Sequence, residues 1–219
     1  MQSASPKASQ DARRAKPALA QIITLRRSVP ELADGLLALV VTDIEGFTPL
    51  VERLGDVAAQ HVLQTHNRIL RQRIHQHAGS EVAHTGDGVI AAFRSVAAAL
   101  ECSRAIQRGL GDSKQLRRTG LRARIGVHAG EPLREEERLF GQCVNVTVRV
   151  CSQAGAGRVL VTDVVRQLAQ GRFSFDAGAS YTLKGVSSPL RLYQLLSSGR
   201  LQRTAAARDG NSQPDASGA

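Results

Sequence analysis

The pattern of hydrophobic and polar residues along this chain shows two periods, one typical of strands and the other of helices. The segment Leu36–Thr42 is an almost unbroken apolar run, which predicts a strand buried on both faces. Apolar positions recur every three or four residues over Phe47–Leu54 and Val57–His77, which predicts two helices. Two further predicted strands, Glu81–Thr85 and Val89–Phe93, flank a Gly-Asp-Gly sequence typical of a hairpin turn.

The same alternation continues through the second half of the chain. Helices are predicted over Ala97–Leu110 and Val144–Ser152, and a third begins at Asp163. Strands alternating with helices, interrupted by one hairpin, predict an α/β (α+β) sandwich with a ferredoxin-like, palm-type sheet and flanking helices. The remaining predicted strands are Leu121–His128, Val159–Thr162, Tyr181–Lys184 and Leu190–Leu195.

The two ends of the chain differ from its middle. Residues 1–33 are rich in Ala, Gln, Lys and Arg and contain three prolines, which predicts a flexible basic arm with a short helix through Leu19–Arg27. Residues 198–219 are rich in Ala and Gly and predict a disordered tail. A single domain over residues 34–197, without internal repeats, is predicted between them.

Composition narrows the possible classes of protein. Aromatic residues make up only 3% of the 219 residues, and no Trp is present, so the core must be aliphatic. The net charge of +10 suits either nucleic acid or a substrate with several phosphates, but the basic residues are scattered, so we predict no nucleic-acid binding. Apolar runs are far shorter than the roughly 20 residues of a membrane span. No signal-peptide pattern is convincing and no Cys spacing suits a metal, so a cytoplasmic, reduced protein is predicted.

Two aspartates lie where a carboxylate is accessible to water. Asp43 directly follows the first predicted strand, and Asp87 occupies the predicted hairpin turn. Two carboxylates brought side by side repel each other unless a cation neutralises them. Hard oxygen ligands favour Mg²⁺ or Mn²⁺, held partly by the protein and partly by substrate phosphates. Considered singly, each residue is better explained structurally, Asp43 as a helix cap and Asp87 as a turn residue.

Other residues extend this candidate site. Gly46 lets the chain turn tightly into a helix, whose free N–H groups could bind phosphate oxygens. Asn145 and Arg149 lie four apart on a predicted helix and therefore share one face. A guanidinium beside an amide suits a ribose and a phosphoryl transition state, although a solvated helix face explains the same pair.

Five motifs occur in a fixed order over residues 36–196. In that order and spacing they resemble the class III adenylyl/guanylyl cyclase catalytic domain of bacterial type. The motifs are Asp-Ile-Glu-Gly-Phe-Thr (43–48), His-Thr-Gly-Asp-Gly-Val-Ile-Ala-Ala-Phe (84–93), Arg-Ile-Gly-Val-His-Ala-Gly (124–130), Phe-Gly-Gln-Cys-Val-Asn-Val-Thr-Val-Arg (140–149) and Leu-Lys-Gly-Val-Ser-Ser-Pro-Leu (183–190).

The resemblance implies a role for each matching position. It implies that Asp43 and Asp87 hold two Mg²⁺ or Mn²⁺ ions per active site, assisted by the carbonyl of Ile44. It implies that the backbone of residues 45–48 contacts phosphates. The remaining implied roles are the phosphate-binding residues Gly46, Phe47, Thr48, Arg124 and Lys184, the ribose-orienting Asn145 and the charge-stabilising Arg149.

The resemblance also implies a reaction and an assembly. A nucleoside triphosphate, ATP in first place, would be converted to a 3′,5′-cyclic nucleotide and pyrophosphate in intracellular signalling. The metal-binding aspartates and the Asn145/Arg149 pair would meet across the interface of a head-to-tail homodimer. Because one chain carries both the aspartates and the Asn145/Arg149 pair, the resemblance implies two equivalent sites per dimer.

Two positions depart from the family pattern. The family reads adenine with a Lys and an Asp, where this chain has Ala83 and Arg138. Arg offers five donors and no acceptor, so Arg138 cannot replace the Asp, but it could donate to a carbonyl such as guanine O6 or uracil O4. Three interpretations stay open: loose recognition of ATP, a cyclase for GTP or UTP, and an inactive dimerising regulatory module. His84, three residues before Asp87, is interpreted as a strand-surface residue rather than a pocket residue.

Overall fold

The computed structural model of the protein describes residues 23–24, 35–135 and 138–197. Apart from Ile23–Thr24, the predicted flexible arm over 1–33 and the predicted tail over 198–219 lie outside the described residues. Ile23–Thr24 form strand β1, which pairs antiparallel with β7 (Arg138–Phe140). The predicted helix through Leu19–Arg27 is therefore wrong at these two positions, because their backbone hydrogen bonds are made to another strand.

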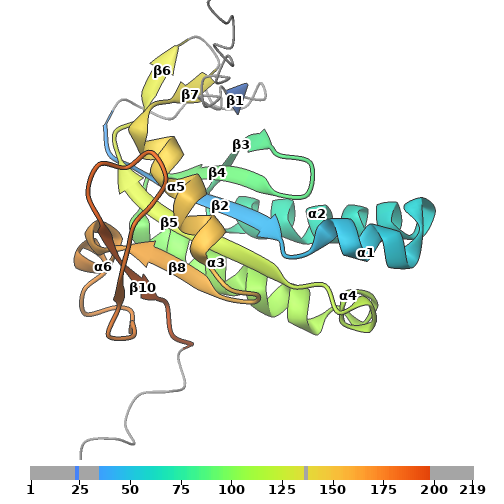
Figure 1. Ribbon diagram of the computed structural model, residues 1–219. Helices are drawn as coiled ribbons and strands as arrows, with labels where there is room; N and C mark the ends of the chain where they lie inside the picture. The colour runs from blue at the N-terminus through green and yellow to red at the C-terminus, as the bar shows by residue number, and fades with distance from the viewer. Residues whose placement is uncertain (1–22, 25–34, 136–137, 198–219) are drawn as a thin grey trace, which may run out of the picture.

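A seven-stranded sheet forms the centre of the molecule, in the order β3-β4-β2-β5-β8-β10-β9 (Figure 1). Strands β5 and β8 pair in parallel, and the other neighbours pair antiparallel. The order β3-β4-β2-β5 is that of a ferredoxin-like sheet, so the predicted fold class is confirmed. The strands are β2 (Leu37–Ile44), β3 (Ser80–His84), β4 (Val89–Phe93), β5 (Ala123–Gly130), β8 (Val159–Thr162), β9 (Ala179–Tyr181) and β10 (Leu190–Gln194).

Helices cover both faces of this sheet (Figure 1). Helix α5 lies across one face, and α2 and α3 lie on the other. Helix α1 follows β2 directly and packs against α2. The helices are α1 (Phe47–Leu54), α2 (Asp56–Gln76), α3 (Val96–Asp112), α4 (Lys114–Thr119), α5 (Gln142–Gln153) and α6 (Asp163–Leu168).

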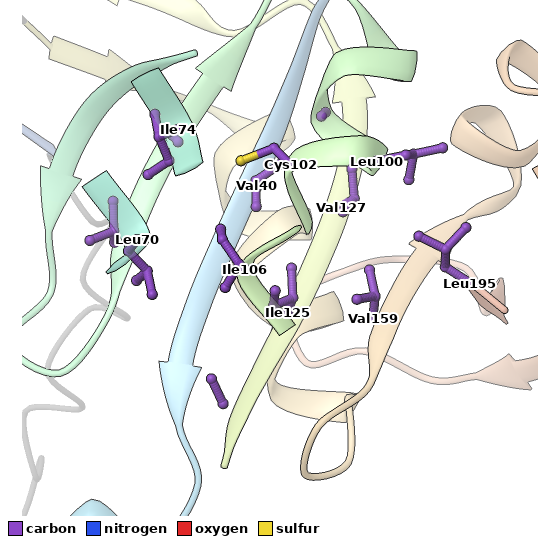
Figure 2. Packing of buried hydrophobic residues seen from close by; sticks show 14 of the residues in the cluster. Val40, Leu70, Ile74, Leu100, Cys102, Ile106, Ile125, Val127, Val159 and Leu195 are labelled. Atoms are coloured by element: carbon purple, nitrogen blue, oxygen red, sulfur yellow. The ribbon is translucent and has the colours of Figure 1, made fainter. Parts of the chain in front are cut away.

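Strand β2 is buried on both faces, as its apolar run predicts. Ala38 and Val40 point into the larger core cluster with residues of α2 and α3, whereas Leu39 and Val41 point into the cluster beneath α5. Figure 2 shows Val40 among the aliphatic side chains of the larger cluster. Because β2 is buried on both faces, its register and depth are fixed, and with them the position of the residues at its end.

Some elements differ from those predicted. Helix α4 was not expected, although Ser113 caps its start through a hydrogen bond from Leu116 N and Gly120 ends it. Strand β6 (Leu133–Glu135) joins β7 and β1 in a second, three-stranded sheet. The described residues include no helix long and apolar enough to cross a membrane.

Candidate active site

Asp43 lies near the end of β2, directly opposite Arg124 on the neighbouring strand β5. The guanidinium of Arg124 contacts Asp43 Oδ2 through Nε at 2.7 Å and through Nη2 at 2.5 Å. Arg124 Nη1 also donates to the backbone oxygen of Ser152, in the last turn of α5, at 3.4 Å. Both side chains of the ion pair are about one quarter exposed, so solvent reaches them.

Asp87 is brought beside Asp43 by a close approach of two backbones. The hairpin turn before β4 passes so near to β2 that a Cβ at Gly88 would lie 1.9 Å from the backbone oxygen of Thr42. Only glycine fits there, since any side chain would collide with the backbone. Val89 N then donates to Thr42 Oγ1 at 3.0 Å, which fixes β4 to β2 one residue before Asp43.

The two carboxylates influence each other electrostatically. Burial raises the pKa of the Asp87 carboxyl, and the neighbouring negative charge of Asp43 raises it further, while the more distant Arg124 acts in the opposite direction. The pair is therefore a site of excess negative charge with one protein cation at its edge. The chemistry of such a pair suits a divalent cation, because a cation would remove the repulsion.

A tight turn connects β2 to the first turn of α1. Gly46 adopts a left-handed conformation with φ of +66°, which L side chains rarely adopt, and its carbonyl accepts from Leu50 N at 3.1 Å. Within the backbone of residues 45–48, the N–H of Glu45 donates to the backbone oxygen of Arg122 at 3.0 Å. The N–H groups of Gly46, Phe47 and Thr48 remain at the helix start, where the helix dipole favours an anion.

These features line one cavity of about 620 Å³. Its size suits a nucleotide, since ligand cavities usually measure about 300–1,000 Å³. The cavity is lined both by the two carboxylates and by the residues at the start of α1. The lining residues are Asp43, Ile44, Gly46, Phe47, Thr48, Pro49, Leu63, Gly86, Asp87 and Arg124.

The other predicted site residues lie elsewhere in the fold. Asn145 is exposed and Arg149 half-buried on α5, and Lys184 is exposed in the turn after β9. Ala83 is half-buried on β3 and packs against the cluster beneath α5, and Arg138 lies on β7. Asn145, Arg149, Lys184 and Ala83 are absent from the described residues that line the cavity.

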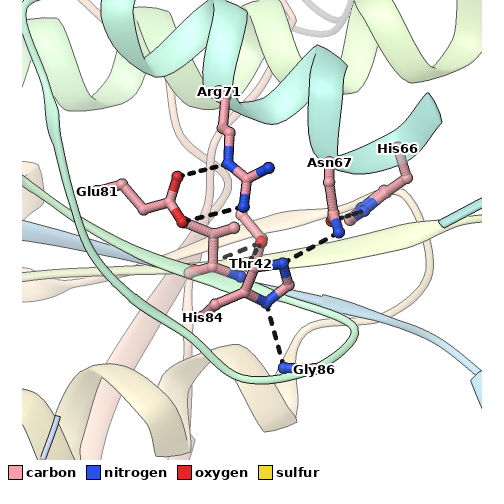
Figure 3. Close-up of polar contacts among 8 residues, drawn as sticks. Thr42, His66, Asn67, Arg71, Glu81, His84 and Gly86 are labelled. Carbon is pink, nitrogen blue, oxygen red and sulfur yellow. Dashed lines mark hydrogen bonds and ion pairs between the residues drawn. The ribbon is translucent and has the colours of Figure 1, made fainter. Parts of the chain in front are cut away.

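The structure also shows polar residues around the site that sequence reasoning did not select. Asn67 on α2 lies between the rings of His66 and His84, and His84 contacts the backbone of Gly86 in the turn that carries Asp87 (Figure 3). His84 is thus not a simple strand-surface residue. The sequence gives no periodic signal for this cluster, because it joins a helix to a strand end.

The groups in this cavity that could bind a divalent cation are mainly oxygen ligands. The described residues contain no group of three or more His, Cys, Asp and Glu side chains arranged to hold a metal ion. The site instead offers the two carboxylates of Asp43 and Asp87 and the neighbouring main chain of Ile44, which all line one cavity. Hard cations such as Mg²⁺ accept one or two carboxylates and complete their shells with substrate phosphates and water, so the residues present fit such a cation.

Comparison with known sequences decides the family. The family model described as the adenylate and guanylate cyclase catalytic domain matches residues 33–197. The chain belongs to this family. Residues 33–197 therefore form a nucleotidyl cyclase catalytic domain. Similar curated proteins include the serine/threonine-protein kinase pkn2 of Myxococcus xanthus (32% identity over 162 residues) and the putative adenylate cyclase 3 of Rhizobium meliloti (29% over 164 residues).

The cyclase domain is much shorter than these relatives. The matches cover 72% of this chain in both cases, but only 19% of the kinase and 28% of the putative cyclase. Solved cyclase structures share its fold over most of their length. The adenylyl cyclase CyaB from P. aeruginosa superposes with a TM-score of 0.67 at 23% identity, covering 75% of this chain and 95% of that chain. The guanylyl cyclase Cya2 gives 0.67 at 22% identity, covering 74% and 92%.

Proposed function

We propose that this chain converts a nucleoside triphosphate, with ATP as the first candidate, to a 3′,5′-cyclic nucleotide and pyrophosphate by two-metal catalysis. One observation carries the proposal: Asp43, Asp87 and the start of α1 line a single cavity of about 620 Å³. A pair of carboxylates without a cation is unfavourable, and a helix start without an anion leaves N–H groups unpaired. A metal-bound triphosphate satisfies both at once.

Asp43, Asp87 and the carbonyl of Ile44 would hold two Mg²⁺ or Mn²⁺ ions. When bound, these ions supply activation of the ribose 3′-hydroxyl and neutralisation of the departing pyrophosphate. The N–H groups of Gly46, Phe47 and Thr48 donate to phosphate oxygens. Arg124 and Lys184 bind the triphosphate tail, and for this Arg124 leaves its partner Asp43.

The reaction forms one bond and breaks another. The 3′ oxygen bonds to the α-phosphorus, the bond from that phosphorus to the oxygen bridging to the β-phosphate breaks, and the hydroxyl proton passes to solvent. Asn145 orients the ribose, and Arg149 stabilises the charge that develops at the α-phosphate. Most of the acceleration then comes from positioning and electrostatics.

We further propose that the working unit is a head-to-tail homodimer. Asn145 and Arg149 are absent from the residues that line the cavity of their own chain, among those described, yet α5 presents Asn145 to solvent. A second copy would bring that face of α5 against the cavity. Each dimer would hold two equivalent sites, and its diffusible product would serve intracellular signalling.

The base that is used depends on Ala83 and Arg138. Ala83 offers no side-chain donor, and Arg138 offers donors without an acceptor. This chemistry favours a carbonyl-bearing base, so GTP or UTP is the second candidate substrate, whereas loose recognition of adenine keeps ATP first.

A four-substrate assay tests the proposal. Purified protein would be incubated with Mn²⁺ and separately with ATP, GTP, CTP and UTP, and the products separated by chromatography. We expect pyrophosphate and a 3′,5′-cyclic nucleotide from at least one of them. Folded, dimeric protein that gives no product from any of the four would overturn the catalytic proposal and leave the inactive regulatory module.

A further inference from the structure

The turn that carries Asp87 is held on its two sides by different means. On the side of β4, Gly88 packs against the backbone of Thr42, and Val89 N donates to Thr42 Oγ1 at 3.0 Å. On the side of β3, Gly86 N donates to Nδ1 of His84 at 3.2 Å. The side chain thus accepts from a backbone N–H two residues ahead, as Asp and Asn side chains do in turns.

Strand β3 is the edge strand of the seven-stranded sheet, so it lacks a neighbour in that sheet on one side. Helix α2 replaces this support through two polar contacts one helical turn apart. Arg71 pairs with Glu81 through Nε–Oε2 at 2.8 Å and Nη2–Oε1 at 3.3 Å, and the amide of Asn67 lies 3.0 Å from His84 Nε2 (Figure 3).

A β-bulge makes both contacts possible. The pairing of β3 with β4 shifts between Glu81 and Ala83, which inserts Val82 as an extra residue. Val82 and Ala83 consequently both pack into the cluster beneath α5, while Glu81 and His84 both face α2. Without the bulge, Glu81 and His84, which are three residues apart, would point to opposite faces.

The hydrogen-bonding chemistry of the rings permits one consistent chain of contacts. A neutral imidazole has a single N–H, so a His84 that accepts at Nδ1 must donate from Nε2. The amide of Asn67 must then offer its oxygen to His84 and its NH₂ to Nδ1 of His66, 3.0 Å away, which is the 180° alternative of the amide. His66 is fully buried, and its burial lowers its pKa to about 4, so its ring is neutral and able to accept.

We propose that His84 is a positioning residue for Asp87, and that Asn67 and His66 hold His84 in the ring orientation that secures the Gly86–Asp87–Gly88 turn. The contacts run from His66, which is buried on α2, to the backbone next to the Asp87 carboxylate. Without the Gly86 contact, the β3 side of the turn keeps the backbone hydrogen bond from Thr85 N to Gly88 O at 2.9 Å, which does not hold Gly86 and Asp87 themselves. Because two carboxylates in one cavity repel each other, Asp87 would then move away from Asp43. The inference rests on the proposed function for the metal ion at Asp87. The contacts that link His66, Asn67, His84 and Gly86 do not depend on that ion.

Mn²⁺ binding to the nucleotide-free dimer tests this role without requiring turnover. His84→Leu keeps the volume and removes both ring nitrogens. We expect the Mn²⁺ concentration for half-saturation, measured by electron paramagnetic resonance of free Mn²⁺, to rise about 10-fold or more, as when other supporting partners of metal ligands are removed. His84→Asn places an amide oxygen where Nδ1 was and should recover most of that loss.

Arg71→Met is the matched control, because it removes the other contact between α2 and β3 and leaves His84 in place. Its Mn²⁺ affinity should stay within about twofold of the unaltered protein. Equal Mn²⁺ affinity for His84→Leu and the unaltered protein, or an equal loss in Arg71→Met, would overturn the proposal.

Hydrogen exchange at the Gly86 amide separates this inference from the proposed function. In the unaltered, metal-free protein this amide should be protected, and in His84→Leu it should exchange at least about 10-fold faster, with Arg71→Met unchanged. If the unaltered protein neither binds Mn²⁺ nor turns over a nucleotide, the metal-site proposal fails while this measurement still decides the role of His84. Should His84→Leu fail to fold, Asn67→Ala is measured in its place. An unchanged exchange rate of the Gly86 amide in that variant would overturn the proposal that Asn67 holds His84 in place.

Discussion

Both contacts between the Arg124 guanidinium and Asp43 fall on one carboxylate oxygen, Oδ2, at 2.7 Å from Nε and 2.5 Å from Nη2. This oxygen is therefore paired with a protein cation at the place where we propose a metal ion. Arg124 is also the residue that we propose for the triphosphate tail. One guanidinium cannot occupy both positions, so binding of metal and nucleotide must separate the pair.

Arg124→Gln should therefore change two affinities in opposite directions. Without the competing guanidinium, Mn²⁺ should bind the nucleotide-free protein about 10-fold more tightly, while the KM for the triphosphate should rise about 10-fold, because a charge-assisted hydrogen bond contributes about 1.5–3 kcal/mol. Equilibrium Mn²⁺ binding and steady-state kinetics measure the two effects. Replacement of the exposed Arg122 by Gln is the control for charge. A parallel change in both affinities would contradict the competition.

Asp87→Asn should stabilise the metal-free protein while reducing turnover by at least about 10³-fold, because it removes a metal ligand together with the repulsion of Asp43. The pKa of Asp87 is raised in the folded protein, chiefly by burial, so folding favours its protonated form. The stability contributed by this carboxyl is present below its unfolded pKa and is lost as the pH rises through its folded pKa.

The gain in unfolding temperature should consequently be larger at about pH 7 than at about pH 4, near the ordinary pKa of an aspartate. Thermal unfolding in the presence of a chelator measures it. The exposed Asp112, changed to Asn, serves as the control for the loss of one carboxylate. An Asp87→Asn protein that is less stable than the unaltered chain at pH 7 would show that the carboxylates do not strain the fold.

Mixing two inactive variants should restore activity if the site is shared between copies. Asp87→Asn and Arg149→Ala each spoil both sites of a homodimer. A heterodimer of the two contains one site in which all residues are intact. Random exchange of subunits at equal concentration should therefore give about one quarter of the activity of the unaltered protein, because half of the dimers carry one good site of two. No activity in the mixture, with subunit exchange verified, would place Arg149 outside the partner's site.

The base-reading positions can be tested by rebuilding the family's adenine pattern. Ala83→Lys combined with Arg138→Asp provides a donor and an acceptor matched to adenine. We expect the ratio of kcat/KM for ATP over GTP to rise about 10-fold or more, since each well-placed hydrogen bond is worth about 1–3 kcal/mol of discrimination. An unchanged product spectrum would mean that these residues do not contact the base.

Much of the fold was predictable because its signals are local. The apolar run of β2, the helical spacing of α2 and the Gly-Asp-Gly turn each occupy one continuous segment, and the structure confirms all three. Helix α4 could have been found from Ser113 and Gly120, the residues that cap it. The strand pairing of Ile23–Thr24 with β7 carries no such signal, since it depends on a chain segment more than 100 residues away.

In the candidate site too, some features could be predicted from local sequence and others could not. The motif residues Asp43 and Asp87 were selected from the sequence, and the structure brings them into one cavity. The ion pair between Asp43 and Arg124 was not foreseen, because it depends on the register of β2 against β5. The proposed role of His84 depends on the bulge in β3, which puts the side chains of Glu81 and His84 on the same side of the strand, facing α2. Neither register nor bulge can be read from periodicity alone.

The order of strands around β2 has a consequence for how the protein is made. β2 pairs with β4, which carries the contact from Thr42 to Val89, 47 residues later, and with β5, which supplies Arg124, 81 residues after Asp43. A nascent chain leaving the ribosome therefore exposes both carboxylates before the arginine that balances them, for the seconds that translation takes at about 5–20 residues per second. Asp43 therefore stays without its guanidinium partner until β5 has been synthesised.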